Sequence, residues 1–162
     1  MVLDLIMWFT TTVWLFLPAY VANATPVLIH GGGALDGGRI WRDGKRILGD
    51  HKTVYGTIAG VVVGTIVGII QDNFLQGMMF SFGAIFGDLV FAFVKRRLGI
   101  KPGQPLILWD QIGFIISAII FGSFIEPRPT IEQDVAMILT TIPVHYITNL
   151  FAWGLDWKKE PW

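Results

Sequence analysis

The sequence contains no cysteine, and its charged residues are few and evenly balanced in sign. Without cysteine the chain has no disulfide, no thiolate catalyst and no zinc–thiolate site, so any metal must bind through oxygen or imidazole. Twelve Lys and Arg residues match twelve Asp and Glu residues, which leaves no net charge to attract nucleic acid. Charged residues make up only 15% of the chain, against about 25% in a typical soluble domain. This shortage argues against an ordinary soluble globular domain.

Apolar residues are abundant instead, at 53% of the chain, and they are gathered in five long stretches. These stretches are Leu3–Val21, Tyr55–Ile70, Met78–Val94, Ile112–Ile125 and Val135–Trp153. Crossing the hydrocarbon core of a bilayer takes about 20 helical residues, and polar flanks at the headgroup level extend the last two spans to 110–125 and 131–153. No Lys or Arg precedes the first stretch, so we do not expect a cleaved signal peptide. The sequence therefore predicts an all-α integral membrane protein with five transmembrane helices in a single domain, residues 1–162.

The basic residues are distributed very unevenly between the segments that join these spans. All except Arg128 lie in three polar segments, which are residues 23–53, residues 95–110 and the tail after Trp153. With five spans, these three segments fall on the same side of the membrane. The positive-inside rule then predicts an N-terminus outside the cell and a C-terminus in the cytoplasm. We expect a multi-pass cell-membrane protein whose two functional loops face the cytoplasm.

The first loop, residues 23–53, is rich in glycine and mixed in charge, and reads NATPVLIHGGGALDGGRIWRDGKRILGDHKT. It shows no helical periodicity beyond a turn, so we expect irregular structure. Glycines let backbone N–H groups approach an anion, and the interleaved Arg and Lys residues supply positive charge. The alternative is a mobile basic loop that rests on anionic lipid headgroups. The loop is not a P-loop, because Gly49 to Thr53 reads Gly-Asp-His-Lys-Thr and lacks the adjacent Gly-Lys-Thr.

Asp88 lies inside the third apolar stretch, seven residues before Lys95. An intramembrane carboxylate is costly and is by default a functional-site hypothesis; its expected partners are Lys95, Arg96 and Asp110. If the second loop closes a hairpin, Asp88 and Asp110 reach the same depth and offer oxygen ligands of the kind that Mg²⁺ prefers. The alternative is that Asp88 only pairs with Lys95 and that Asp110 only caps a helix.

Two spans carry features that repeat every four residues. In the second span these are Gly56, Gly60, Gly64 and Gly68, which predict a smooth helix face for close packing within the monomer, with a dimer contact as the alternative. In the last span these are Thr141, His145 and Asn149, which predict hydrogen-bonded packing or the lining of a polar cavity.

The two loops together resemble those of the CDP-archaeol synthase family, membrane cytidylyltransferases related to phosphatidate cytidylyltransferase. The resemblance covers essentially the whole chain, including the five-span layout. The matching residues are Asn23, Thr25 and Pro26, then Asp36-Gly37-Gly38 and Arg46 to Thr53, then Gly87-Asp88-Leu89, Lys95-Arg96-Arg97, and Pro105 through Asp110-Gln111.

The resemblance implies a Mg²⁺-dependent transfer of CMP from CTP to 2,3-bis-O-geranylgeranylglycerol 1-phosphate. The products are unsaturated CDP-archaeol, an intermediate of archaeal phospholipids, and pyrophosphate. Expected partners are therefore CTP, an isoprenoid glycerol-ether phosphate lipid and the bilayer, with no nucleic acid and no obligate protein partner.

The resemblance also implies roles for a subset of the matching residues. Asp88 and Asp110 would hold Mg²⁺, and Lys95 and Arg96 would complete the catalytic set. The residues expected to bind CTP or the lipid phosphate are Asn23, Thr25, Pro26, Asp36, Gly37, Gly38, Asp50, His51, Lys52, Thr53, Arg97 and Gln111.

Two other classes of membrane protein are the alternatives. An ion-coupled transporter could also use intramembrane Asp88, although charge and glycine gather in the loops and no inverted repeat is evident. A CDP-alcohol phosphotransferase acts on a related lipid, but its motif of Asp residues at helical spacings on one helix is absent here. The nucleotide discriminates between the classes, since a cytidylyltransferase consumes CTP, a phosphotransferase releases CMP and a transporter does neither.

Overall fold

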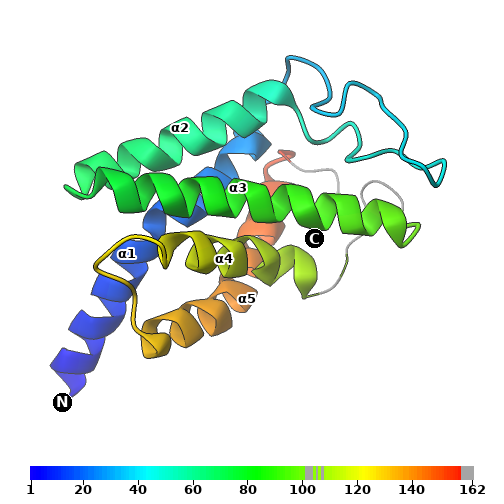
Figure 1. Cartoon of the computed structure of the whole chain (residues 1–162). Coiled ribbons are helices and arrows are strands. Elements are labelled where there is room, and N and C mark those ends of the chain that lie inside the picture. Colours follow the sequence, from blue (N-terminus) through cyan, green and yellow to red (C-terminus); the bar gives the residue numbers. More distant parts are fainter. Residues whose placement is uncertain (101–103, 105, 107, 158–162) are drawn as a thin grey trace.

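The computed structural model describes residues 1–100, 104, 106 and 108–157, and within them the protein is built from five α-helices (Figure 1). The helices are α1 (Val2–Leu28), α2 (Val54–Ile70), α3 (Phe74–Arg97), α4 (Trp109–Gly122) and α5 (Ile131–Gly154). These residues contain no named β-strand, only two isolated bridges in the first loop. By length and composition, α1, α3 and α5 are apolar enough to cross a membrane, whereas α2 and α4 are shorter apolar helices. The expected all-α fold with five helices is confirmed.

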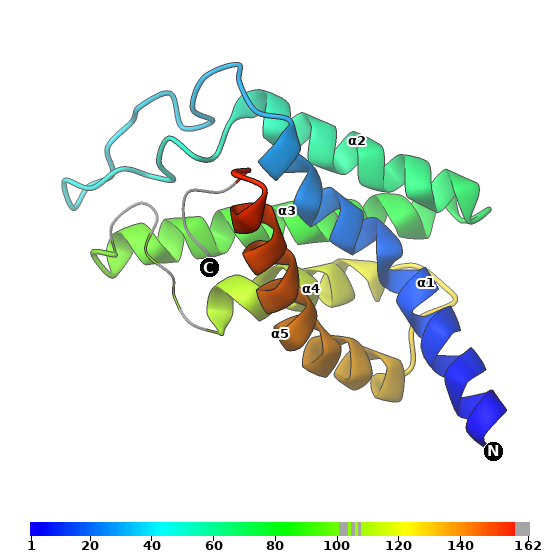
Figure 2. The same ribbon diagram turned by 180° about the vertical axis from the view of Figure 1, so that it is seen from behind.

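Helix α3 lies at the centre of the bundle and contacts α1, α2 and α4, while α5 packs mainly on α4 (Figures 1 and 2). The first loop, the last turn of α3 and the first turn of α4 lie at one end of the bundle. The N-terminus and the turns between α2 and α3 and between α4 and α5 lie at the other end. The chain therefore collects its charged segments at one end of an apolar bundle, and this end is called the loop end below.

The structure moves several boundaries that were expected from the sequence. Helix α1 continues to Leu28, so Asn23, Thr25 and Pro26 are helical and the expectation that they belong to the first loop is wrong. Thr25 sits buried inside the helix with its hydroxyl donating to the carbonyl of Val21 at 2.7 Å. In a bilayer the backbone must satisfy its own N–H groups, which favours continuing the helix through polar residues.

The second loop is also shorter than expected, because α3, which begins at Phe74, continues to Arg97. Lys95 to Arg97 therefore form the last turn of α3, where positive side chains interact favourably with the helix dipole. Helix α4 begins at Trp109, so the described part of the second loop is limited to residues 98–100, 104, 106 and 108. The remainder of that segment lies outside the described residues.

The glycines of α2 pack directly against the neighbouring helices. Gly56, Gly60, Gly64 and Gly68 are all buried. A Cβ atom added at Gly64 would lie 2.7 Å from the carbonyl oxygen of Pro18, and one added at Gly68 would lie 2.5 Å from the Cα of Gly77. No side chain fits at these contacts with α1 and α3. The expectation of close packing within the monomer is confirmed.

Several polar groups inside the bundle are hydrogen-bonded, as the polar stripe of the last span predicts. Thr141 is fully buried and lies 2.5 Å from the hydroxyl of Tyr20 on α1, and His145 contacts the amide of Asn149 at 3.0 Å. Pro18 in α1 has no N–H to donate to the carbonyl of Trp14, and the side chain of Gln71 donates to that carbonyl instead. These bonds spare the helices the penalty of an unpaired polar group in an apolar core.

Candidate active site

The first loop, residues 29–53, is organised around the carboxylate of Asp36. This side chain is only 1% exposed and accepts backbone N–H bonds from Gly38, Leu48 and Gly49 at 2.9–3.0 Å. The guanidinium of Arg46 completes the set at 2.7 Å. The pKa of Asp36 is held far below its ordinary value, first by Arg46 and then by the three backbone N–H groups. The loop thus has a defined internal structure, which argues against a purely mobile basic segment.

Two backbone features let the loop fold around this carboxylate. Gly37 and Gly38 have φ values of +58° and +79°, which residues with a side chain rarely adopt, and they turn the chain directly after Asp36. A short antiparallel bridge between Ile40 and Arg46 then closes a hairpin. The loop returns to the helices at Thr53, whose side chain accepts from the backbone N–H of Gly56 at 3.2 Å and caps α2.

Asp88 on α3 is paired with Lys52, the residue directly before the cap of α2. The ammonium nitrogen of Lys52 lies 2.7 and 2.6 Å from the two carboxylate oxygens. Both side chains are partly exposed, at 27% for Lys52 and 32% for Asp88. The expected partners were Lys95, Arg96 and Asp110, and the reading in which Asp88 only pairs with Lys95 is wrong. The first loop crosses back to α3 and brings Lys52 to the carboxylate, whereas Lys95 is engaged elsewhere.

Lys95 pairs with Asp110 across the ends of α3 and α4. Its ammonium nitrogen lies 2.6 Å from Oδ2 of Asp110, which also accepts from the backbone N–H of Leu106 at 2.8 Å. Asp110 is in the first turn of α4, where the helix dipole favours a negative charge. The structure therefore gives each of the two carboxylates a lysine partner of its own at the loop end.

The donor chemistry of Asp88 and Asp110 fits Mg²⁺. The residues that the structure describes include no group of three or more His, Asp or Glu side chains able to form a metal site by themselves. Mg²⁺ usually binds through one or two carboxylates and completes its shell with water and substrate phosphates. Two carboxylates about one-third exposed supply the oxygen donors that this pattern requires.

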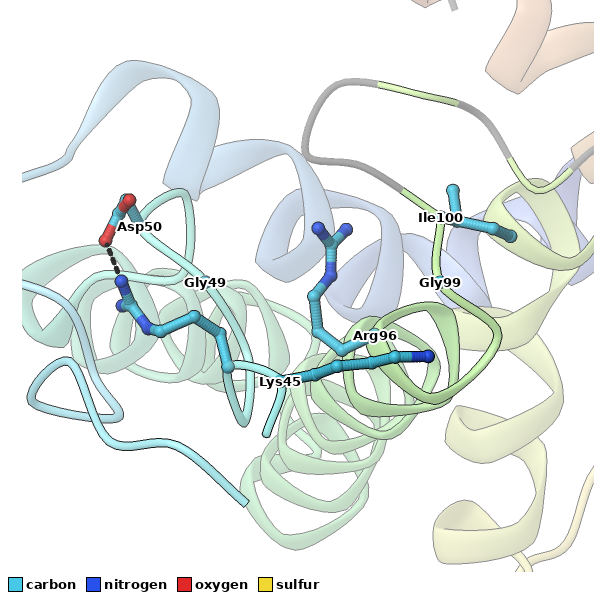
Figure 3. A pocket seen from close by; sticks show the side chains of 7 residues that line it. Lys45, Gly49, Asp50, Arg96, Gly99 and Ile100 are labelled. Atoms are coloured by element: carbon cyan, nitrogen blue, oxygen red, sulfur yellow. Dashed lines mark ion pairs between the residues drawn. The ribbon is translucent and has the colours of Figure 1, made fainter. Parts of the chain in front are cut away.

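A pocket of about 270 Å³ opens at the loop end between the first loop and the last turn of α3 (Figure 3). It is lined by Lys45, Arg46, Gly49, Asp50, Arg96, Gly99 and Ile100. Arg46 is bound to Asp50 at 2.8 Å, whereas Figure 3 shows the guanidinium of Arg96 without an ion pair to the residues drawn. Nε of Arg96 is buried and has no hydrogen-bond partner in the described part of the chain. Three cationic side chains and two glycines make this pocket a candidate site for an anion.

Sequence reasoning identified part of this pocket and missed part of it. Asp50 and Arg96 were expected site residues and line the pocket, whereas Lys45, Arg46 and Gly49 were not in the expected set. The alternation of glycine with basic residues in the first loop was the sequence pattern that could have indicated these three residues as part of an anion-binding pocket.

Three other residues that were expected to bind substrate make contacts within the helix bundle. Thr25 bonds to its own helix, Pro26 lies against Gly56 of α2, and Thr53 caps α2. His51 is exposed, while Asn23 and Gln111 are half-buried. Their roles in substrate binding stay predictions.

A family model described as "CarS-like: CDP-archaeol synthase" matches residues 2–76 and 70–162. The chain belongs to the CDP-archaeol synthase family. It is 44% identical to the CDP-archaeol synthase of Thermococcus kodakarensis, over 96% of this chain and 99% of the relative. It is 46% identical to that of Thermococcus gammatolerans, over 92% of this chain and 94% of the relative.

A solved structure described as an intramembrane enzyme for archaeal membrane lipid biosynthesis has the same fold. The TM-score is 0.75 at 34% identity, with 85% of this chain and 92% of that chain covered. With the three apolar helices, this likeness identifies a membrane protein. Membership of the CDP-archaeol synthase family identifies an enzyme and gives the transporter alternative no support.

Proposed function

We propose that this protein transfers CMP from CTP to 2,3-bis-O-geranylgeranylglycerol 1-phosphate and releases pyrophosphate. One observation carries the proposal beyond family membership: a basic pocket lies beside two carboxylate–lysine pairs at the loop end. A triphosphate needs the cations, and a magnesium–nucleotide complex needs the carboxylates. Both requirements meet at one end of the bundle.

The reaction needs little covalent assistance from the protein. An oxygen of the lipid phosphate forms a bond to the α-phosphorus of CTP, and the bond between the α-phosphorus and the bridging oxygen of pyrophosphate breaks. Because the nucleophile is already an anion, no general base is required. The work of the site is to neutralise charge and to align the reacting groups. Arg96, Arg46 and Lys45 supply positive charge for the phosphates in this scheme.

Asp88 and Asp110 would hold Mg²⁺ in this proposal. The ion, when bound, neutralises phosphate charge and orients the triphosphate. Lys52 and Lys95 neutralise these carboxylates in the present arrangement. If Mg²⁺ bound these carboxylates, the two lysines would lose their partners and would be free to bind the substrate phosphates.

We further propose that all five helices cross the membrane, with the loop end in the cytoplasm. This orientation is supported by the concentration of basic side chains at the loop end, because the positive-inside rule assigns such segments to the cytoplasmic side. Helix α2 has 17 residues and spans roughly 25 Å, and its polar flanks extend it to the headgroups. A fusion of GFP or alkaline phosphatase at the C-terminus tests the orientation. Fluorescence is expected, and phosphatase activity would reverse the assignment.

The direct test of the reaction is pyrophosphate release by the detergent-purified protein. CTP and Mg²⁺ are supplied with and without the digeranylgeranylglyceryl phosphate. Release that depends on both the lipid and CTP is expected, with UTP as the control nucleotide. If the folded protein released none under these conditions, or released CMP instead, the cytidylyltransferase proposal would fail.

A further inference from the structure

The last turn of α3 carries three consecutive basic residues with three different surroundings. Lys95 binds Asp110, and Arg96 lines the basic pocket. Arg97 contacts the first loop instead. Successive helical residues project about 100° apart, so the three side chains leave the helix in separate directions. The position of a basic residue in this turn therefore does not by itself assign it to phosphate binding.

Arg97 is engaged with the hairpin of the first loop, residues 39–47. One terminal nitrogen donates to Oδ1 of Asp43 at 2.7 Å. The other donates to the backbone carbonyls of Lys45, at 3.3 Å, and of Arg46. The ammonium group of Lys45 returns a bond to the carbonyl of Arg97 at 2.9 Å. The contact between hairpin and helix end is thus reciprocal.

An aromatic contact supports the same junction. The guanidinium carbon of Arg97 lies 4.7 Å from the ring centroid of Phe93, one turn earlier on α3. Trp41 of the hairpin meets the same ring edge-on, with centroids 5.5 Å apart. Cation–π and edge-to-face contacts of this kind add to the hydrogen bonds. Arg97 and Phe93 together form the surface of α3 on which the hairpin packs.

The hairpin residue that Arg97 holds is itself part of the pocket wall. Arg97 bonds to the backbone of Arg46, whose side chain lines the pocket and pairs with Asp36 and Asp50. Arg97 is not among the residues that line the pocket in the described part of the chain. Its effect on the pocket is therefore transmitted through the backbone of the hairpin.

We propose that Arg97 is a positioning residue. By holding the hairpin against the end of α3, it fixes Lys45 and Arg46 as one wall of the pocket and contacts no phosphate itself. The inference rests on the proposed use of this pocket for the phosphates of CTP. It assigns neighbouring arginines to different tasks, with Arg96 binding the anion and Arg97 holding the wall.

The test compares Arg97→Met with its matched control Arg96→Met in the full-length, detergent-purified protein. Limited trypsin cleavage in the hairpin, mapped by mass spectrometry, reports whether residues 39–47 stay folded on α3. Pyrophosphate release at varied CTP reports KM and kcat. For Arg97→Met we expect several-fold faster hairpin cleavage and a KM raised about tenfold, with kcat within about threefold, because the hairpin must be ordered again upon binding. For Arg96→Met we expect unchanged hairpin cleavage and a kcat/KM lower by on the order of 100-fold.

Arg97→Met with unchanged hairpin cleavage would overturn the proposal, whether turnover is lost or normal. If Arg97→Met is not recovered folded, Arg97→Lys and Asp43→Asn replace it, because a lysine keeps the charge but cannot reproduce the guanidinium fork. Faster hairpin cleavage in both is expected, and cleavage at the wild-type rate in both would refute the positioning role. Failure of the proposed function looks different: the wild-type protein would release no pyrophosphate, while Arg97→Met would still expose the hairpin.

Discussion

Two regions at the loop end both depend on buried or half-buried aspartates, but they use them in different ways. Asp36 in the first loop is 1% exposed and is bound by one guanidinium and three backbone N–H groups. Asp88, inside α3, and Asp110, in the first turn of α4, are about 30% exposed, and each has one lysine partner. Backbone donors cannot leave without unfolding the loop, whereas a lysine side chain can move. A carboxylate with fixed donors is suited to structure, and one with a movable partner is suited to ligand exchange.

The largest expected effect comes from removing a carboxylate of the second kind. Asp88→Asn and Asp110→Asn should each lower turnover by on the order of 100-fold or more, because both charges hold Mg²⁺ in the proposed reaction. Each variant should still be recovered as a folded protein, since only one lysine loses its partner. Pyrophosphate release across a Mg²⁺ titration measures the first effect, and size-exclusion chromatography with thermal unfolding measures the second.

Asp72→Asn is the matched control for these two variants. Asp72 is exposed in the turn between α2 and α3, and its φ of +56° is one that asparagine adopts readily. Its turnover should equal that of the wild type. Near-normal activity of Asp88→Asn or Asp110→Asn would contradict the assignment of these carboxylates to the metal.

Asp36→Asn should show the opposite pattern, with a large effect on stability. The amide group cannot accept from all four donors, and leaving a buried donor unpaired costs about 1 to 3 kcal/mol. Arg46 itself is 30% exposed and keeps Asp50 as a partner. The free energy of unfolding in denaturant, or the midpoint of thermal unfolding in one fixed detergent, measures this loss. Hairpin cleavage by trypsin should also rise. If Asp36→Asn were as stable as the wild type but inactive, Asp36 would belong with the ligand-exchanging carboxylates.

The pH dependence of stability sharpens the same comparison. Because the pKa of Asp36 is lowered in the folded protein, its contribution is fully present above the ordinary carboxyl pKa of about 4. The contribution is lost as the pH falls below that value toward the lowered pKa of the folded state. The difference in stability between wild type and Asp36→Asn should therefore be constant from pH 5 to pH 8 and shrink below about pH 4. A difference that already shrinks near neutral pH would indicate another titrating group.

The sequence was informative about the bundle because long apolar stretches and four-residue spacings are local signals. The glycines of α2 and the polar residues of α5 predicted their own contacts without knowledge of the fold. The end of α1 was misplaced because Pro26 and Asn23 look like loop residues, whereas tertiary packing keeps them helical.

The site was harder to predict because its pairings depend on the path of the first loop. Lys52 and Asp88 are 36 residues apart, and no local spacing relates them. The different surroundings of Arg96 and Arg97 also depend on where the hairpin rests on α3, which the sequence pattern leaves open. The glycine and basic residues of the loop indicated the kind of ligand but not which side chain faces it.

The smallest expected effect comes from Asp50, which shares Arg46 with Asp36. The side chain of Asp50 is 77% exposed and its oxygen lies 2.8 Å from Arg46, so the shortest distance alone would rank this ion pair close to that of Asp36, at 2.7 Å. An exposed pair is weakened by solvent and salt, and Asp50→Asn should change the free energy of unfolding by less than about 1 kcal/mol. Comparing the free energy of unfolding of Asp50→Asn with that of Asp36→Asn in the same detergent shows whether burial of the carboxylate or its distance from Arg46 determines the stability of the loop. A loss as large as that of Asp36→Asn would mean that Arg46, rather than the buried carboxylate with its fixed donors, organises the first loop.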